Sequence, residues 1–190
     1  MALVLASASP RRRELLEKIG IDELRIIPAR GAELVPEGAG AREAVLAISR
    51  GKALEVQEQC APDDVIIAAD TVVALDGAIL GKPGSAEEAK DMLRRLSGRE
   101  HEVYTGVTVL RGSRELCCCE RTAVRFRALS AAEIDAYVAT GEPMDKAGAY
   151  GAQGLGSLLV EGITGDFFNV MGLPLCRLGR MLSDMGVKLL

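Results

Sequence analysis

The chain has 190 residues, of which 48% are hydrophobic and 26% are charged, and its formal net charge is −4. This length and composition are typical of one globular domain, or one domain with a lobe, that buries a sizeable core. The negative charge and the few aromatic residues (three Tyr, three Phe and no Trp) disfavour a protein that binds nucleic acid.

The cellular compartment of the protein can be inferred from its apolar runs and from the spacing of its cysteines. No apolar run approaches the roughly 20 residues that span a membrane. The first residues, MALVLASAS, lack the positive flank and the longer apolar run of a signal peptide. Five cysteines are present, three of them consecutive at 117–119, and their spacing matches no zinc site. We therefore expect a cytoplasmic protein without a membrane partner, whose consecutive thiols are buried in a strand.

The hydrophobic pattern predicts strands and helices that alternate along the chain. Ser9 and Pro10 suit the start of the first helix, and capping boxes at 85–88 and 130–133 open two later ones. The alternation is not a regular βαβ repeat, so the expected fold is α/β, a mixed sheet with flanking helices. In chain order, we expect a strand over 2–7, a helix over 9–20, a strand over 24–29, a helix over 41–60, strands over 65–75 and 78–83, a helix over 85–98, strands over 102–112 and 114–129, a helix over 130–141, a strand-turn-strand over 156–170 and a helix over 173–187.

The dipeptide 76–77, Asp-Gly, predicts a two-residue hairpin turn. Counting outward from this turn places Thr71 beside Lys82. Strict alternation would then put Asp70 and Lys82 on opposite faces of the sheet. The two side chains can meet only where the ladder frays or bulges, and we expect it to do so there.

The loop before the first helix, LASASPRRRELL, carries three consecutive arginines where a helix begins. A strand that feeds a helix N-terminus presents free backbone N–H groups to an anion. Ser7 adds a hydroxyl, and the guanidinium groups of Arg11, Arg12 and Arg13 suit phosphate oxygens. The alternative is an exposed basic turn whose arginines pair with nearby glutamates.

Asp70 interrupts an apolar strand, where a carboxylate is costly unless it is paired or liganded. It is interpreted as a metal ligand or general base, with a strand-end Asp bonded to backbone as the alternative. Lys52 falls on the apolar stripe of its predicted helix. Either its aliphatic stem packs along that face and its ammonium reaches water, or the side chain points into a cleft.

Three further features have weaker patterns. Glu33 gains meaning only if a metal lies between it and Asp70. The glycine-rich stretch 148–157 suits close approach to a flat ligand or simply a tight turn, and Gln153 within it could bond a nucleobase edge. His101, the only histidine, is expected on the surface. Together, several cations, two carboxylates and an amide suit a polyphosphate with a divalent metal, Mg²⁺ or Mn²⁺.

Six segments, spread over the whole chain, closely resemble the motifs of the Maf family of nucleotide pyrophosphatases. They are SASPRRRELL, AADTVV, GKP, YTGV, GEPMDKAGAYGAQG and GDFFNVMGLPL. The resemblance implies a single domain over 1–190, with a fold related to inosine triphosphate pyrophosphatases and two lobes around a deep cleft. It also implies hydrolysis of a nucleoside triphosphate to the monophosphate and pyrophosphate, with a divalent cation.

The resemblance also implies roles for individual residues. Asp70 would be the proton acceptor. Arg12, Thr71 and Gln153 match positions that tune substrate choice. The remaining matches lie around the phosphates and metal: Ser7, Glu33, Lys52 and Lys82. Arg13, beside Arg12 in the arginine loop, is also expected to bind the substrate.

The segments ADTVV and AYGAQG place the chain in the branch that resembles UTP/dTTP pyrophosphatases. The branch acting on 7-methyl-GTP tends to carry D-Q-V instead. Two alternatives remain: a pyrophosphatase that prefers a modified or 7-methylated nucleotide, and a regulatory binding protein of septum formation, with which the family is also associated. The expected partner is the nucleotide substrate, and a homodimer is compatible with the sequence.

Overall fold

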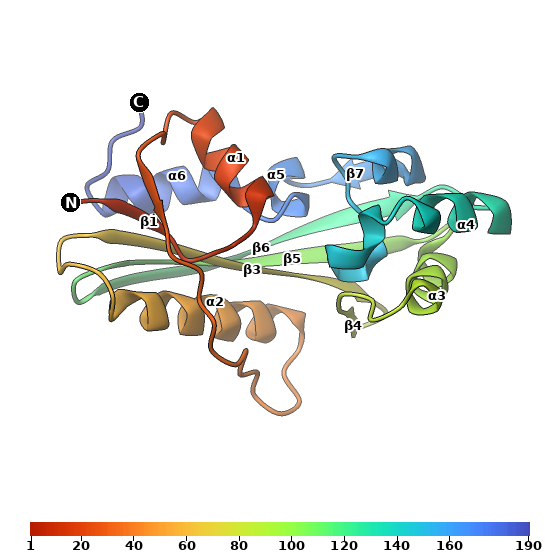
Figure 1. The fold of residues 1–190 in the computed structure, drawn as a ribbon, viewed down its shortest axis with the longest axis horizontal. Helices are drawn as coiled ribbons and strands as arrows, with labels where there is room; N and C mark the ends of the chain where they lie inside the picture. Colours follow the sequence, from red (N-terminus) through yellow and green to blue (C-terminus); the bar gives the residue numbers. More distant parts are fainter.

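The computed structural model describes all 190 residues as one twisted sheet with helices on both faces (Figure 1). The strands are β1 (Leu3–Leu5), β2 (Leu24–Ile26), β3 (Val65–Leu75), β4 (Ala78–Leu80), β5 (Glu100–Arg111), β6 (Arg114–Phe126) and β7 (Val160–Thr164). The helices are α1 (Pro10–Lys18), α2 (Ala41–Gln57), α3 (Ala86–Leu96), α4 (Ala131–Ala139), α5 (Phe167–Val170) and α6 (Leu175–Asp184), with short 3-10 turns η1 (Glu142–Asp145), η2 (Ala147–Ala149) and η3 (Leu155–Leu159). None of the helices is both long and apolar enough to cross a membrane.

The sheet has seven strands in the order β2-β1-β3-β5-β6-β7, and β4 pairs with β3 on the same edge as β1. β1 runs parallel to both β2 and β3, whereas the other pairs are antiparallel. The predicted mixed sheet with flanking helices is therefore confirmed.

The long strands β3, β5 and β6 run through both halves of the elongated molecule (Figure 1). β1 pairs with β3 only as far as Leu5 opposite Ile67, and β4 pairs with it only from Val73 onward. Between these points the edge of β3 is open, and Asp70 lies in this interval. The gap separates one lobe, with β1, β2, α1, α2 and α6, from another with β4, α3, α4 and β7.

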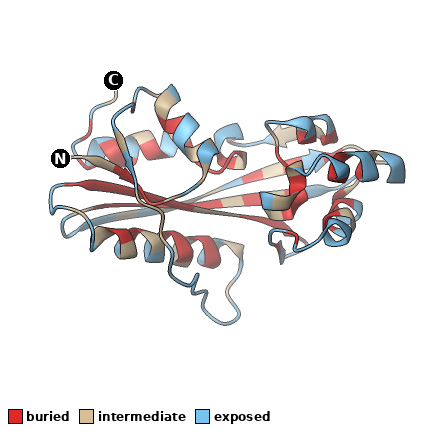
Figure 2. Cartoon of the chain, in the orientation of Figure 1, coloured by how far each residue is buried: buried red, intermediate tan, exposed pale blue.

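Each lobe has its own core, and buried residues follow the sheet from end to end (Figure 2). In the first lobe, one cluster packs α1 and α6 against one face of the sheet, and a smaller one packs α2 against the other face. In the second lobe, a cluster joins α3 and α4 to the far ends of β3, β5 and β6. The separate cores hold the cleft walls in place on either side of the gap.

The hairpin prediction is confirmed, since Leu75 pairs with Ala78 across Asp76-Gly77. β4 ends at Leu80, so the ladder is frayed before it reaches Lys82, as expected. The capping box at Ser130 is complete, but the one at Ser85 is only half formed, because Glu88 bonds the N–H of Gly84 rather than that of Ser85.

Three expectations were wrong. Over 156–170 only β7 is a strand. A 3-10 turn precedes it, and α5 follows because Asp166 caps the N–H of Phe168. His101 is 2% exposed rather than on the surface, because its ring packs edge-on against two aromatic rings. The consecutive cysteines lie in β6, but the side chain of Cys117 is exposed and only Cys118 packs against the core.

Candidate active site

A cleft of about 1010 Å³ lies at the open edge of β3. The first lobe contributes the loop after β1, the start of α1, and one side of α2, and the second lobe contributes the loop after β4 and the segment from η1 to Gly154. Asp70 and Thr71, although adjacent in the strand, both line the cleft. Their side chains leave opposite faces of a strand whose edge is uncovered there.

Asp70 and Lys52 form the centre of the cleft. The Lys52 ammonium donates to Oδ1 of Asp70 at 2.8 Å and pairs with Oε1 of Glu33 at 2.7 Å. The Lys52 and Asp70 side chains are 19% and 13% exposed, whereas Glu33 is 55% exposed at the cleft mouth. The hydrogen bond from Lys52 lowers the pKa of Glu33, so this carboxylate stays charged at neutral pH. Lys52 thus points into the cleft.

Close packing of α2 against β5 places Lys52 at this depth. Gly106 of β5 lies under the helix, and a Cβ added there would come within 2.3 Å of the backbone oxygen of Val45. Only glycine therefore permits α2 to lie this close to the sheet. This accounts for the glycine in the YTGV segment.

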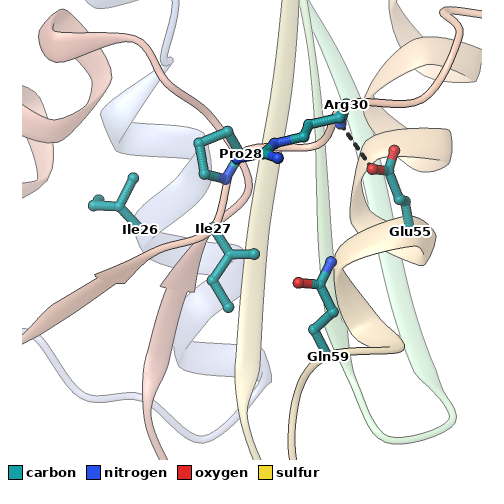
Figure 3. Close-up of a pocket in the computed structure, with 6 residues that line it drawn as sticks. All are labelled: Ile26, Ile27, Pro28, Arg30, Glu55 and Gln59. Atoms are coloured by element: carbon teal, nitrogen blue, oxygen red, sulfur yellow. Dashed lines mark hydrogen bonds between the residues drawn. The ribbon is translucent and has the colours of Figure 1, made fainter.

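The segment that carries Glu33 is held to α2 by Glu55. Its carboxylate accepts the backbone N–H groups of Arg30, at 2.7 Å, and Gly31, at 3.0 Å. Figure 3 shows this contact at the rim of a second, smaller hollow of about 470 Å³ beside the end of β2. These two backbone hydrogen bonds lower the pKa of Glu55. The hollow therefore lies beside the contact that anchors the Glu33 loop to α2.

Arg12 is fixed by three hydrogen bonds. Its Nε donates to the Gly172 carbonyl at 2.8 Å, Nη1 to Oγ of Ser7 at 3.2 Å, and Nη2 to Oγ1 of Thr71 at 3.1 Å. Burial lowers the pKa of Arg12, and the nearby Asp70 carboxylate opposes that shift. The guanidinium is thus held rigidly at the cleft wall, joining the loops that carry Ser7 and Gly172.

The side chains of the other two arginines of the loop point in different directions. Arg13 points away from the cleft and pairs with Glu17 one turn later, at 2.7 Å. The structure thus does not bring Arg13 to the predicted substrate site, because the helical turn directs it outward. Arg11 lines the cleft instead and reaches across it to Asp145 of η1, at 3.5 Å.

The start of α1 completes this wall of the cleft. Ser9 occupies the predicted N-cap position, but its side chain makes no capping bond. Pro10 has no N–H and the N–H of Arg13 bonds the Ser9 carbonyl, so the backbone N–H groups of Arg11 and Arg12 are left for an anion.

The opposite wall is the segment that ends in the glycine-rich loop. Glu142 organises it by accepting the N–H groups of Leu155, at 2.9 Å, and Gly156, at 3.0 Å, and the hydroxyl of Tyr137, at 2.8 Å. Gln153 is exposed on the loop so formed and lines the cleft, as does Lys82 on the loop after β4. Lys82 and Asp70 thus share the cleft but make no ion pair.

Sequence reasoning named all three arginines for phosphate but assigned Arg13 rather than Arg11 to the substrate site, and it missed Glu142 and Tyr137. Arg11 and Arg13 stand in the same basic run, and only the turn of α1 separates their directions. Glu142 and Tyr137 carry no pattern of their own, since their importance comes from backbone groups that reach them 13 to 14 residues later in the chain.

The sequence comparisons bear directly on this cleft. A family model described as Maf-like protein matches residues 2–185. The chain belongs to the Maf family. Two relatives of this Maf chain are dTTP/UTP pyrophosphatases. That of Thermococcus kodakarensis is 52% identical over 188 residues, covering 99% of this chain and 98% of its own. That of Moorella thermoacetica is 50% identical over 189 residues, covering 97% and 95%.

The Maf chain also resembles the solved structure of a HAM1 protein from Coxiella burnetii. The TM-score is 0.54 at 16% identity, over 97% of this chain and 99% of that one. At this identity the likeness concerns the fold alone, and it confirms the predicted fold class. The site residues of this Maf protein are placed by its own geometry.

Proposed function

We propose that this Maf protein hydrolyses dTTP and UTP to the monophosphate and pyrophosphate. The observation that carries the proposal is the Asp70 carboxylate, 13% exposed and held by Lys52 at 2.8 Å, in a cleft lined by further cations. The names of close relatives, dTTP/UTP pyrophosphatases at 47–52% identity, support the choice of nucleotide.

The cations of the cleft suit a triphosphate. Arg11, Lys52 and Lys82 approach from three different segments, and the uncapped start of α1 adds backbone N–H groups. Such a set neutralises several phosphate oxygens at once and stabilises the charge that develops on a departing pyrophosphate. A nucleoside without phosphates would offer these cations no negatively charged group.

Asp70 is positioned to act as the base. Lys52 bonds Oδ1, which fixes the carboxylate and leaves Oδ2 to accept a proton from water. The water oxygen bonds to the α-phosphorus, the bond from that phosphorus to the α–β bridging oxygen breaks, and pyrophosphate leaves with that oxygen. The proton remains on Asp70 until it is returned to solvent.

The donor set also fits a divalent cation. Glu33 and Asp70 each lie within 2.8 Å of the same ammonium nitrogen, so two carboxylate oxygens converge on one point. One or two carboxylates with water and phosphate oxygens are a typical environment for Mg²⁺. We therefore propose that these residues hold Mg²⁺ or Mn²⁺ together with the substrate. When bound, it would neutralise phosphate charge and polarise the phosphorus.

We place the protein in the cytoplasm. All five cysteines are free thiols, which suits a reducing compartment.

The test is a substrate panel with product analysis. Purified protein is incubated with UTP, dTTP, CTP, GTP, 7-methyl-GTP and ITP, with Mg²⁺ or Mn²⁺. Pyrophosphate with UMP or dTMP is expected. Orthophosphate with a diphosphate would contradict the mechanism, preference for 7-methyl-GTP would contradict the substrate, and no turnover would favour a regulatory binding protein.

The matched variants are Asp70→Asn and Asp91→Asn. The first should lower kcat by about 10²-fold or more, because it removes the base. The second changes an exposed carboxylate on α3 that pairs only with Arg94, and it should keep the wild-type rate. Wild-type turnover by Asp70→Asn would overturn the role of Asp70.

A further inference from the structure

Behind Thr71 lies a chain of buried hydroxyl groups. Oγ1 of Thr71 is 2.9 Å from Oγ1 of Thr105, which is fully buried in β5. Thr105 in turn donates to the backbone carbonyl of Asn169, at 3.0 Å. On the cleft side, Arg12 donates to Thr71 at 3.1 Å. The cleft wall is thus connected to the interior through two hydroxyls.

The direction of these bonds follows from counting protons. A threonine hydroxyl has one proton and two lone pairs. The Asn169 carbonyl can only accept, so the proton of Thr105 is used there. Thr105 must then accept from Thr71, and the proton of Thr71 points into the protein. Arg12 occupies one lone pair of Thr71, and the other is left for the cleft.

We propose that Thr105 is a specificity-determining positioning residue, which keeps the Thr71 hydroxyl an acceptor and so selects substrates that present a hydrogen-bond donor. This inference rests on the proposed function. A phosphate oxygen, which only accepts, gains nothing from such a hydroxyl. The donor must belong to the nucleoside, either an N–H of the base or a hydroxyl of the sugar.

The imide of uracil and thymine fits the pair of Arg12 and Thr71. Three of the five N–H groups of Arg12 are used within the protein, so two remain as donors. These two donors suit a base carbonyl, and the Thr71 acceptor beside them suits the neighbouring N3–H. Cytosine presents an unprotonated N3 at this position, which would face the lone pair of Thr71.

The variant Thr105→Val removes the acceptor of the Thr71 proton without a change of shape. The Asn169 carbonyl keeps a second donor, the N–H of Gly172 at 2.9 Å, so no buried carbonyl is left unpaired. Thr71 is then free to turn its proton to the cleft and to donate to cytosine. The ratio of kcat/KM for UTP to that for CTP should fall by about fivefold or more, through a gain for CTP.

Two variants serve as controls. Thr105→Ser keeps the hydroxyl and should keep the wild-type ratio. Thr108→Val makes the same change on the same strand, at a buried hydroxyl that bonds Ser49 at 3.0 Å and lies outside the chain of bonds to Thr71. It should also keep the wild-type ratio. Merely structural damage would lower kcat/KM for UTP and for CTP by the same factor.

The measurement compares UTP, dUTP and CTP for all four proteins, with binding of non-hydrolysable UTP and CTP analogues by calorimetry. An unchanged ratio in Thr105→Val, or an equal change in Thr108→Val, would overturn the proposal. A change between UTP and dUTP, which differ only in the 2′-hydroxyl, with no change between UTP and CTP would assign the donor to the sugar and overturn the imide. If the wild type releases no pyrophosphate, the proposed function fails, and the binding ratio still decides the role of Thr105.

Discussion

The ammonium nitrogen of Lys52 lies 2.8 Å from Oδ1 of Asp70, and the same nitrogen lies 2.7 Å from Oε1 of Glu33. One positive charge therefore stands between the two carboxylates that we propose as ligands of a divalent cation. A metal ion bound to these same two oxygens would take the place of the ammonium on Oδ1 and leave Oδ2 of Asp70 to accept a proton, as in the proposed mechanism. Lys52 then becomes free to meet a phosphate oxygen.

This competition predicts the effect of Lys52→Met. The variant should bind Mn²⁺ in the absence of nucleotide about tenfold more tightly than the wild type, because a neighbouring positive charge is removed. Turnover should fall, since a cation is lost from the phosphate site. Calorimetry with Mn²⁺ measures the affinity, and Lys18→Met, at the exposed end of α1, is the control. Weaker Mn²⁺ binding by Lys52→Met would refute the idea that the metal ion and the Lys52 ammonium occupy the same position.

Arg12 and Arg13 should differ in their effect on substrate binding. Arg12→Ala removes three hydrogen bonds at the cleft wall, and the KM for UTP should rise by about tenfold or more. Arg13→Ala removes only a surface ion pair with Glu17, so KM should be unchanged and stability should fall by about 0.5 kcal/mol at most. Steady-state kinetics with UTP measure the KM of both variants. Equal KM values would mean that the two arginines are interchangeable.

Gly106→Ala should displace α2. The new Cβ would approach the Val45 carbonyl oxygen to 2.3 Å, and backbone atoms cannot move aside locally. We expect a loss of about 1–3 kcal/mol in the free energy of unfolding, with lower turnover because Lys52 moves with the helix. Gly51→Ala on α2 is the control. Its Cβ would meet nothing within 4 Å, and it should stabilise the protein by up to about 1 kcal/mol. Urea unfolding of both variants makes the comparison, and a stable, fully active Gly106→Ala would disprove the packing argument.

Acid should destabilise the protein through His101. Burial lowers the pKa of His101 to about 4, whereas the unfolded chain has the ordinary value of 6.5. Between these values the unfolded state binds the extra proton, so stability falls as the pH falls from 6.5 toward 4. The contribution should be about 2 kcal/mol between pH 7 and pH 5.

The comparison is with His101→Phe, which has no titrating ring at this position. Free energies of unfolding in urea at pH 7 and pH 5 should show a smaller pH dependence for the variant. The variant also loses the bond from His101 to the Tyr150 hydroxyl, at 2.8 Å, so a uniform loss of stability at both pH values is expected. A pH dependence equal to that of the wild type would show that His101 does not titrate as stated.

Much of the fold could be predicted because local signals agree with the tertiary structure. The Asp76-Gly77 turn, the Ser130 capping box and the periodicity of α2 each specify their element without help from distant residues. Where the prediction was wrong, distant contacts decided. The segment at Phe167 forms a helical turn because the buried Asn169 donates to the distant Val103 carbonyl and Thr122, and the local Asp166 cap adds to this.

The site was predictable where a residue type conflicts with its surroundings. Asp70 in an apolar strand and Lys52 on an apolar stripe are such conflicts, and the structure brings the two together. The sequence could not separate Arg11 from Arg13, because both are basic and only the phase of α1 distinguishes them. His101 was misplaced since a histidine has no fixed preference for surface or interior, and its aromatic neighbours come from distant parts of the chain.

The strands that join the two lobes have a mechanical consequence. β3, β5 and β6 pass through the cleft region without interruption, so no flexible linker is available as a hinge. Any rotation of one lobe against the other must twist these strands, and the twist falls on the one stretch of β3 that has an uncovered edge. Asp70 and Thr71 lie on that stretch. A substrate that draws the lobes together would therefore reorient the proposed base, Asp70, and the proposed selecting hydroxyl, Thr71, in a single motion.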